Sequence, residues 1–139
     1  MFTAKVYRVM VGSLSGAMEE VYVAKETIRK WNQQNAERTG KLFMPIEWSS
    51  EPEVIQNVDV VVGIIDNWLD NPKLIEESIE TGKQVMLLFN AVHDPINSMQ
   101  SEVESVRSLW NKCHTRCYCV CYNDMKELED LLSKQIETF

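Results

Sequence analysis

Polar and aromatic side chains that could bind a ligand follow four apolar runs of the sequence, each at the point where the run ends. They are Ser13, Ser15, Trp48, Asp66, Asn67, Trp68, Asn90 and His93. If these runs are parallel strands, their carboxyl ends meet at one edge of a sheet, which is where such sheets bind ligands. The sequence therefore predicts one binding site assembled from these residues.

The segment from Gly12 to Gly16 reads Gly-Ser-Leu-Ser-Gly and precedes a helical pattern. Its hydroxyls and backbone N–H groups would lie at a helix N-terminus, where a phosphate or carboxylate is favoured. We predict that Ser13 and Ser15 hold a phosphate. The structural alternative is that Ser15 only caps the helix.

The remaining loop residues suggest contacts with the rest of a nucleotide. Trp48 and Trp68 lie off the helical stripes, so either indole could stack on a base; Trp68 would equally suit packing at a subunit contact. Asp66 or Asn67 would bond a ribose hydroxyl. These assignments predict a nucleotide-like ligand.

Acid–base chemistry has less support in the sequence. His93 beside Asp94 has the composition of an acid–base pair, but a lone histidine in a loop is more often solvated. Asp66 does not fit the phosphorylated aspartate of receiver domains. Those domains need an acidic pair after the first strand and a lysine after the fifth, where this chain has Gly12-Ser13 and Asn123-Asp124.

The four cysteines fall within nine residues, at positions 113, 117, 119 and 121. Such crowding does not join distant segments as a secreted disulfide framework does, so we expect reduced thiols. Cys117, Cys119 and Cys121 would share one face of a strand at a spacing of about 7 Å. Tetrahedral zinc needs its sulfurs closer together, so we predict buried packing and no metal site.

Short apolar runs alternate with helical periodicities along the whole chain, which is typical of a parallel sheet covered on both faces. Pro45 indicates an edge strand, and the crossover at 51–56 has room only for a short helix. Asn123 or Asp124 would cap the last helix. The expected strands are 5–11, 42–46, 60–65, 84–89 and 116–122. Five such pairs in a single domain, 1–139, predict a flavodoxin-like α/β fold, a three-layer arrangement with a five-stranded parallel sheet in the order 2-1-3-4-5.

Charge and hydropathy exclude several function classes. Lys and Arg number 14 against 21 Asp and Glu, and the net charge of −7 repels nucleic acid and anionic lipid alike. The longest apolar runs, 60–65 and 85–89, are far shorter than the roughly 18 residues of a membrane span. The N-terminal residues lack a leader pattern, so we expect a cytoplasmic protein that binds neither nucleic acid nor membrane.

Several segments together resemble a bacterial family of unknown function that is similar in fold to nucleoside 2-deoxyribosyltransferases and TIR domains. The segments are 9–32, 44–48, 58–63, 76–89 and the tail from Tyr122. The resemblance implies a nucleotide-like ligand such as an ADP-ribose derivative. The catalytic glutamate of the deoxyribosyltransferases falls at Leu74, which implies binding without turnover, for example to sequester the ligand.

Three alternatives stay open. Glu77 could replace the missing acid in an N-glycosidase or deoxyribosyltransferase acting on nucleosides or NAD. The Gly12–Gly16 loop also resembles the phosphate loop of flavodoxins, although the flavodoxin glycine-rich aromatic loop is missing after the fourth strand, so we expect no resident cofactor. A protein-binding domain is the third.

We also expect self-association as a homodimer or a higher homo-oligomer. The region of the third helix carries Trp68, Leu69, Leu74 and Ile75, and the shortened crossover after Trp48 leaves part of the sheet without cover. Apolar surface of this kind is commonly buried by a second copy.

Overall fold

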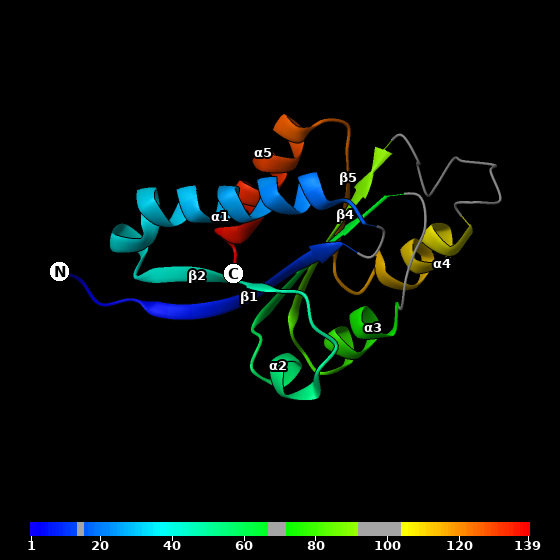
Figure 1. The fold of residues 1–139 in the computed structure, drawn as a ribbon, viewed down its shortest axis with the longest axis horizontal. Helices are drawn as coiled ribbons and strands as arrows, with labels where there is room; N and C mark the ends of the chain where they lie inside the picture. The colour runs from blue at the N-terminus through cyan, green and yellow to red at the C-terminus, as the bar shows by residue number, and fades with distance from the viewer. Residues whose placement is uncertain (14–15, 67–71, 92–103) are drawn as a thin grey trace.

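The computed structural model describes residues 1–13, 16–66, 72–91 and 104–139. Five parallel strands form one sheet in the order β2-β1-β3-β4-β5, which confirms the predicted flavodoxin-like order (Figure 1). The elements are β1 (Lys5–Ser13), α1 (Met18–Thr39), β2 (Lys41–Glu47), α2 (Pro52–Gln56), β3 (Val60–Ile65), α3 (Lys73–Glu80), β4 (Gln84–Asn90), α4 (Glu104–Cys113), β5 (Tyr118–Tyr122) and α5 (Met125–Ile136).

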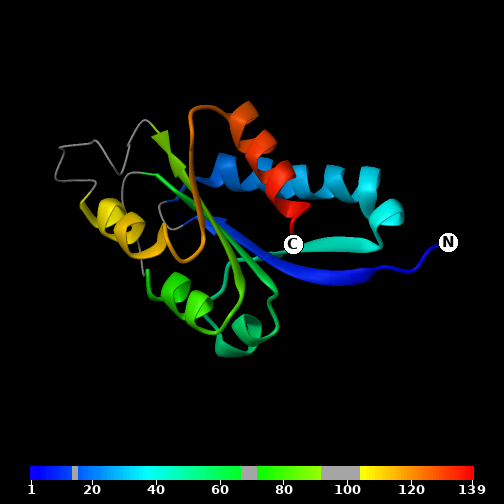
Figure 2. The same cartoon turned by 180° about the vertical axis from the view of Figure 1, so that it is seen from behind.

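Helices cover both faces of the sheet. The opposite views in Figures 1 and 2 show α1 and α5 on one face and α2, α3 and α4 on the other. Because alternate side chains of a strand point to opposite faces, each strand contributes to two separate cores. Val9, Val62 and Leu88 pack under α1 and α5, whereas Met10 and Leu87 pack on the α3 side.

Local residues account for one end of each long helix, the end of α1 and the start of α5. α1 buries an apolar stripe that runs from Ala17 to Trp31. Gly40 ends the helix in the left-handed region at φ 69°, donating its N–H to the Ala36 carbonyl. Asp124 caps α5, accepting from the Glu127 backbone N–H at 2.8 Å. β2 pairs only with β1 and is therefore an edge strand, as Pro45 predicted.

The thiols are closer together than we expected. β5 begins at Tyr118, so Cys117 lies in the bend before the strand and does not follow strand alternation. The expected spacing of about 7 Å is therefore wrong for Cys117 and Cys119, whose Sγ atoms lie 3.7 Å apart. A hydrogen bond with Cys113 lowers the pKa of the Cys117 thiol, but the contact with Cys119 and burial outweigh it and raise the pKa to about 12.

The thiols belong to the core on the α3 side. Cys113 is buried there, and the other three cysteines are partly buried against the same cluster. Within the described ranges, no three His, Cys, Asp or Glu side chains are grouped so that they could hold a metal ion. No helix in the described part of the chain is long and apolar enough to cross a membrane.

Candidate ligand-binding site

Four polar side chains lie at the carboxyl-terminal edge of the sheet, and we call them the edge cluster: Ser13, Asp66, Asn90 and Tyr122. Ser13, Asn90 and Tyr122 end their strands, and Asp66 directly follows β3. The residues two positions earlier in each strand face α1 and α5, so alternation directs the edge cluster to that same face. The sequence predicted Ser13, Asp66 and Asn90 at this edge, and the fold brings them together.

Ser13 is already engaged in holding the first turn of α1. Its Oγ accepts a hydrogen bond from the Ala17 backbone N–H at 2.9 Å. This contact satisfies one of the N–H groups that a helix start leaves without an intrahelical partner. One acceptor position of the Ser13 hydroxyl is therefore committed to the helix before any ligand binds.

Asp66 and Asn90 form the middle of the cluster. The Asn90 amide Nδ2 donates to Asp66 Oδ1 at 3.3 Å, and both side chains are half-buried. The contact joins the ends of β3 and β4, which are neighbours in the sheet. Carboxylate and amide groups are the acceptors and donors that recognise ligand hydroxyls and amines.

Tyr122 is a site residue that the sequence did not reveal. It pairs with Asn90 at the end of β5, is only 3% exposed, and its hydroxyl has no hydrogen-bond partner within the described residues. Burial, and then the charges of Glu20 and Asp66, raise the pKa of the phenol. The Tyr122 phenol therefore keeps its proton at neutral pH. It is a buried hydrogen-bond donor near acidic side chains.

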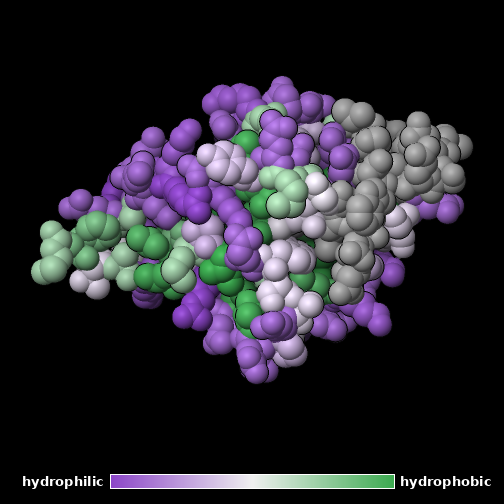
Figure 3. Space-filling model, viewed as in Figure 1, coloured by the Kyte–Doolittle hydropathy of each residue, from purple (hydrophilic) through white to green (hydrophobic). Residues whose placement is uncertain are grey.

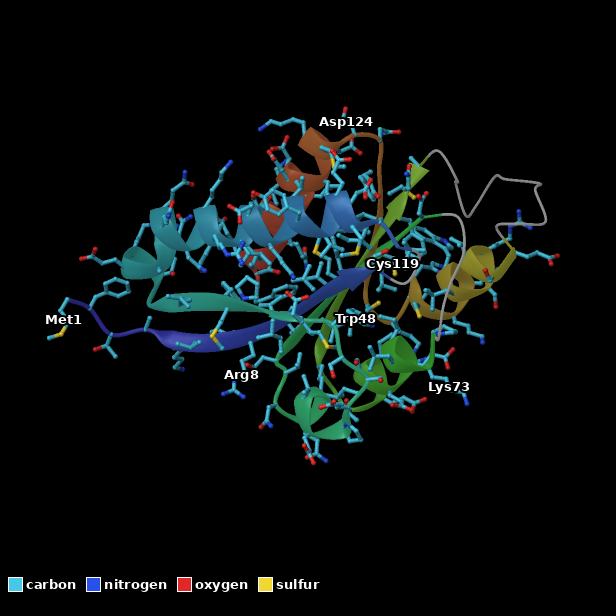
Figure 4. The ribbon with its side chains drawn as sticks, viewed as in Figure 1. Met1, Arg8, Trp48, Lys73, Cys119 and Asp124 are labelled. Carbon is cyan, nitrogen blue, oxygen red and sulfur yellow. The ribbon has the colours of Figure 1, made fainter. Side chains whose placement is uncertain are left out.

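Trp48 lies on the other face of the sheet. Its side chain packs on Gly12, where an added Cβ would lie 2.6 Å from Trp48 Cβ and Cε3. The ring reaches across to Gly63, which is paired with Gly12 in the sheet. Trp48, which Figure 4 labels, packs against the core on the α3 side, whereas the edge cluster faces α1 and α5.

Comparison with known proteins identifies the fold only. No protein-family model matches the sequence, and no curated protein sequence matches it. A de novo designed protein with a Rossmann 2x3 fold, solved by NMR, superposes over 98% of this chain and 91% of its own, with a TM-score of 0.50 and 13% identity. The fold is Rossmann-like, in its flavodoxin-like order.

A second solved structure is a short-chain flavodoxin associated with a non-canonical PDU bacterial microcompartment. Its superposition on this protein covers 99% of each chain, with a TM-score of 0.47 and 12% identity. Neither likeness supports a relationship to deoxyribosyltransferases or TIR domains, which stays a prediction. In Rossmann-like sheets the carboxyl edge is the usual ligand site, and the edge cluster lies there.

The other predicted residues divide into two groups. Ser15, Asn67, Trp68 and His93 lie outside the described residues. Glu77 lies on the exposed side of α3 together with Lys73 and Glu80, whereas Leu74 is buried against the sheet. The described part of α3 therefore directs no carboxylate toward the edge cluster.

The electrostatics at this edge favour hydroxyl and amine groups over phosphate. Glu19 and Glu20 occupy the first turn of α1, where they oppose the partial positive charge of the helix N-terminus. Asp66 adds a third carboxylate nearby. A ligand with several phosphates would meet repulsion here, whereas ribose hydroxyls would find acceptors.

Proposed function

We propose that the protein binds a small nucleoside-like molecule at the edge cluster and releases it chemically unchanged. The observation that carries this proposal is the buried hydroxyl of Tyr122, which lies beside Asp66 and Asn90 and has no hydrogen-bond partner in the part of the chain that the structure describes. A buried donor without a partner costs about 1–3 kcal/mol, which a bound acceptor would recover. Tyr122 would donate to a ring nitrogen or carbonyl of the ligand.

Asp66 and Asn90 would bind the sugar. The carboxylate accepts from a ribose hydroxyl, and the amide both accepts and donates. The resemblance to the deoxyribosyltransferase-like family suggests an ADP-ribose derivative, and the acidic edge favours a ligand with few phosphates over a triphosphate. The backbone N–H groups before α1, with Ser13, would receive any phosphate that is present.

Binding without turnover is favoured because glycoside cleavage needs a pair of carboxylates across the scissile bond. Leu74 stands where the family's nucleophile would be, and Glu77 faces solvent. Incubation with nucleosides and NAD should therefore leave them intact by liquid chromatography. Steady release of free base or nicotinamide would establish the N-glycosidase alternative instead.

Calorimetric titration and thermal shift with adenosine, AMP, ADP-ribose and FMN test binding directly. We expect adenosine or ADP-ribose to raise the melting temperature in proportion to ligand excess, as mass action requires. Native mass spectrometry of the purified protein would reveal a ligand that is retained. FMN as the tightest binder would support the flavodoxin alternative.

Tyr122→Phe is the decisive variant because it removes only the hydroxyl. We expect affinity for the bound nucleoside to fall about tenfold, the value of one hydrogen bond of about 1.4 kcal/mol. The free energy of unfolding without ligand should be unchanged or higher, since a buried unsatisfied donor disappears. Tyr118→Phe, in the same strand and facing the same core, is the matched control and should leave affinity unchanged. Equal affinities for wild type and Tyr122→Phe would contradict the proposal.

A further inference from the structure

Half of the sheet has a helix on only one side. On the α1 side, Val9 of β1 and Phe43 of β2 are fully buried. On the other side, the same two strands leave Val6 55% and Met44 39% exposed. In Figure 3 hydrophobic residues are gathered at this end of the molecule, over the N-terminal segment and β1–β2.

The shortness of α2 leaves this face open. The crossover from β2 to β3 forms only the five-residue helix Pro52–Gln56, which lies beside the face and not over it (Figure 1). Between them lies a groove of about 380 Å³, lined by Arg8, Met44, Ile46, Glu53, Val54 and Asn57. The surface therefore has a ridge, α2, next to a hollow over β1 and β2.

This surface also carries opposite charges on its two parts. Arg8 projects from β1 on the α2 side, as Figure 4 shows, and Glu53 lies on α2. Neither side chain has an ion-pair partner among the described residues. When two copies are related by a two-fold axis, both contribute the same surface to the contact. The ridge of each copy then faces the hollow of the other, and each Arg8 can face the Glu53 of the other copy.

We propose that this face, defined by Val6, Arg8, Met44, Ile46 and α2, is where two copies of the chain form an isologous dimer. Charge balance selects a second copy as the occupant. The molecule as a whole carries −7, so two copies repel one another except where a surface offers both signs around an apolar centre. Pro45 lacks an N–H, which disfavours the competing arrangement in which two β2 edges pair.

Sedimentation velocity over a concentration series tests the dimer, in the absence of any ligand and hence separately from the proposed binding function. The wild-type protein should approach twice the 16.1 kDa mass of the chain. Met44→Glu places a carboxylate in the apolar centre, beside its register partner Arg8, where it competes with the other copy's Glu53 for that cation, and should give a monomer. Met18→Glu is the matched control, because Met18 is 72% exposed on α1 and should leave the dimer intact.

Charge reversal then tests the orientation of the two copies. Arg8→Glu and Glu53→Arg should each weaken dimerisation about tenfold, because each places like charges opposite one another. The double variant restores both pairs within one interface and should regain the wild-type dissociation constant. Circular dichroism would verify that these exposed substitutions leave the fold intact.

Three results would overturn the inference. One is a wild-type protein that stays monomeric throughout the series. Another is a dimer that survives Met44→Glu, which would indicate pairing elsewhere, such as the β2 edges. The third is a double charge variant no better than the single ones.

Discussion

Gly12 and Trp48 show how a single pair of residues separates the two faces of the sheet. The space that a side chain at position 12 would fill is occupied by Trp48. The indole therefore covers the ends of β1 and β3 on the α3 side, while Ser13, the next residue, points to the other side and holds α1. This alternation leaves the edge cluster on the α1 face.

Gly12→Ala should destabilise the protein by about 1–3 kcal/mol, the usual cost of overpacking. The new Cβ would lie 2.6 Å from Trp48 Cβ, close to the backbone, where little movement is available. Gly63→Ala is a matched control and should cost less, since its nearest neighbour is the mobile Cδ2 of Leu87 at 3.0 Å. Urea unfolding measures both changes.

The Trp48→Ala background identifies the cause of that loss. Gly12→Ala should cost far less there, because the two substitutions remove and create the same contact and cannot be additive. Equal costs in the two backgrounds would mean that the glycine is required for another reason.

Single residues at the edge were only partly predictable from the sequence. Ser13, Asp66 and Asn90 directly end apolar runs, and parallel strands must bring such positions together. The role of Tyr122 was hidden because its alternation with Tyr118 and Val120 equally predicts a core aromatic. Trp48 also follows an apolar run. The sequence alone could not show on which face of the sheet its ring packs, because the ring lies against the glycines at 12 and 63, which belong to other strands.

At the scale of elements, the cap at the start of α5 was predicted from the sequence, whereas the start of β5 was not. Gly40 and Asp124 act through local backbone geometry, which the sequence encodes within a few residues. The start of β5 was predicted two residues too early, at 116, because strand length depends on pairing with β4. That difference alone places the Cys117 sulfur beside Cys119.

Asp124→Ala should lower the free energy of unfolding by about 1 kcal/mol, since the Glu127 N–H at the start of α5 loses its acceptor. Asp124→Ser should retain most of the stability because serine is also a good capping residue. Asp130→Ala, later in the same helix, removes only an exposed contact with Lys126 and should change stability little. Chemical denaturation that ranks Asp130→Ala as the more harmful variant would refute this role of the cap.

At the scale of the whole molecule, the sheet order followed from the alternation of strands and helices, which leaves few right-handed arrangements for one short chain. The bare half of the sheet also has a visible origin in the sequence, the cramped crossover after Trp48. The sequence could not show which residues that crossover uncovers. Val6 and Met44 belong to strands whose other faces carry the buried Val9 and Phe43. Only the pairing register of β1 with β2 brings the two exposed side chains onto neighbouring strands of one surface.

Stability of the molecule at alkaline pH should depend on Tyr122. In the unfolded chain the phenol ionises near its ordinary pKa of 10.0, whereas burial and the charges of Glu20 and Asp66 raise the pKa in the folded state. The unfolded state therefore loses its proton first, and stability that is fully present below pH 10 declines as the pH rises beyond it. Tyr122→Phe removes this titration, so its free energy of unfolding should fall less steeply above pH 10 than that of the wild type. Urea unfolding at neutral and alkaline pH measures the free energy of unfolding of both proteins, and the contributions of the groups that they share cancel in the difference. Identical slopes would mean that the Tyr122 hydroxyl is as solvated in the folded protein as in the unfolded chain, and the edge cluster would then lack the buried donor on which ligand binding is proposed to depend.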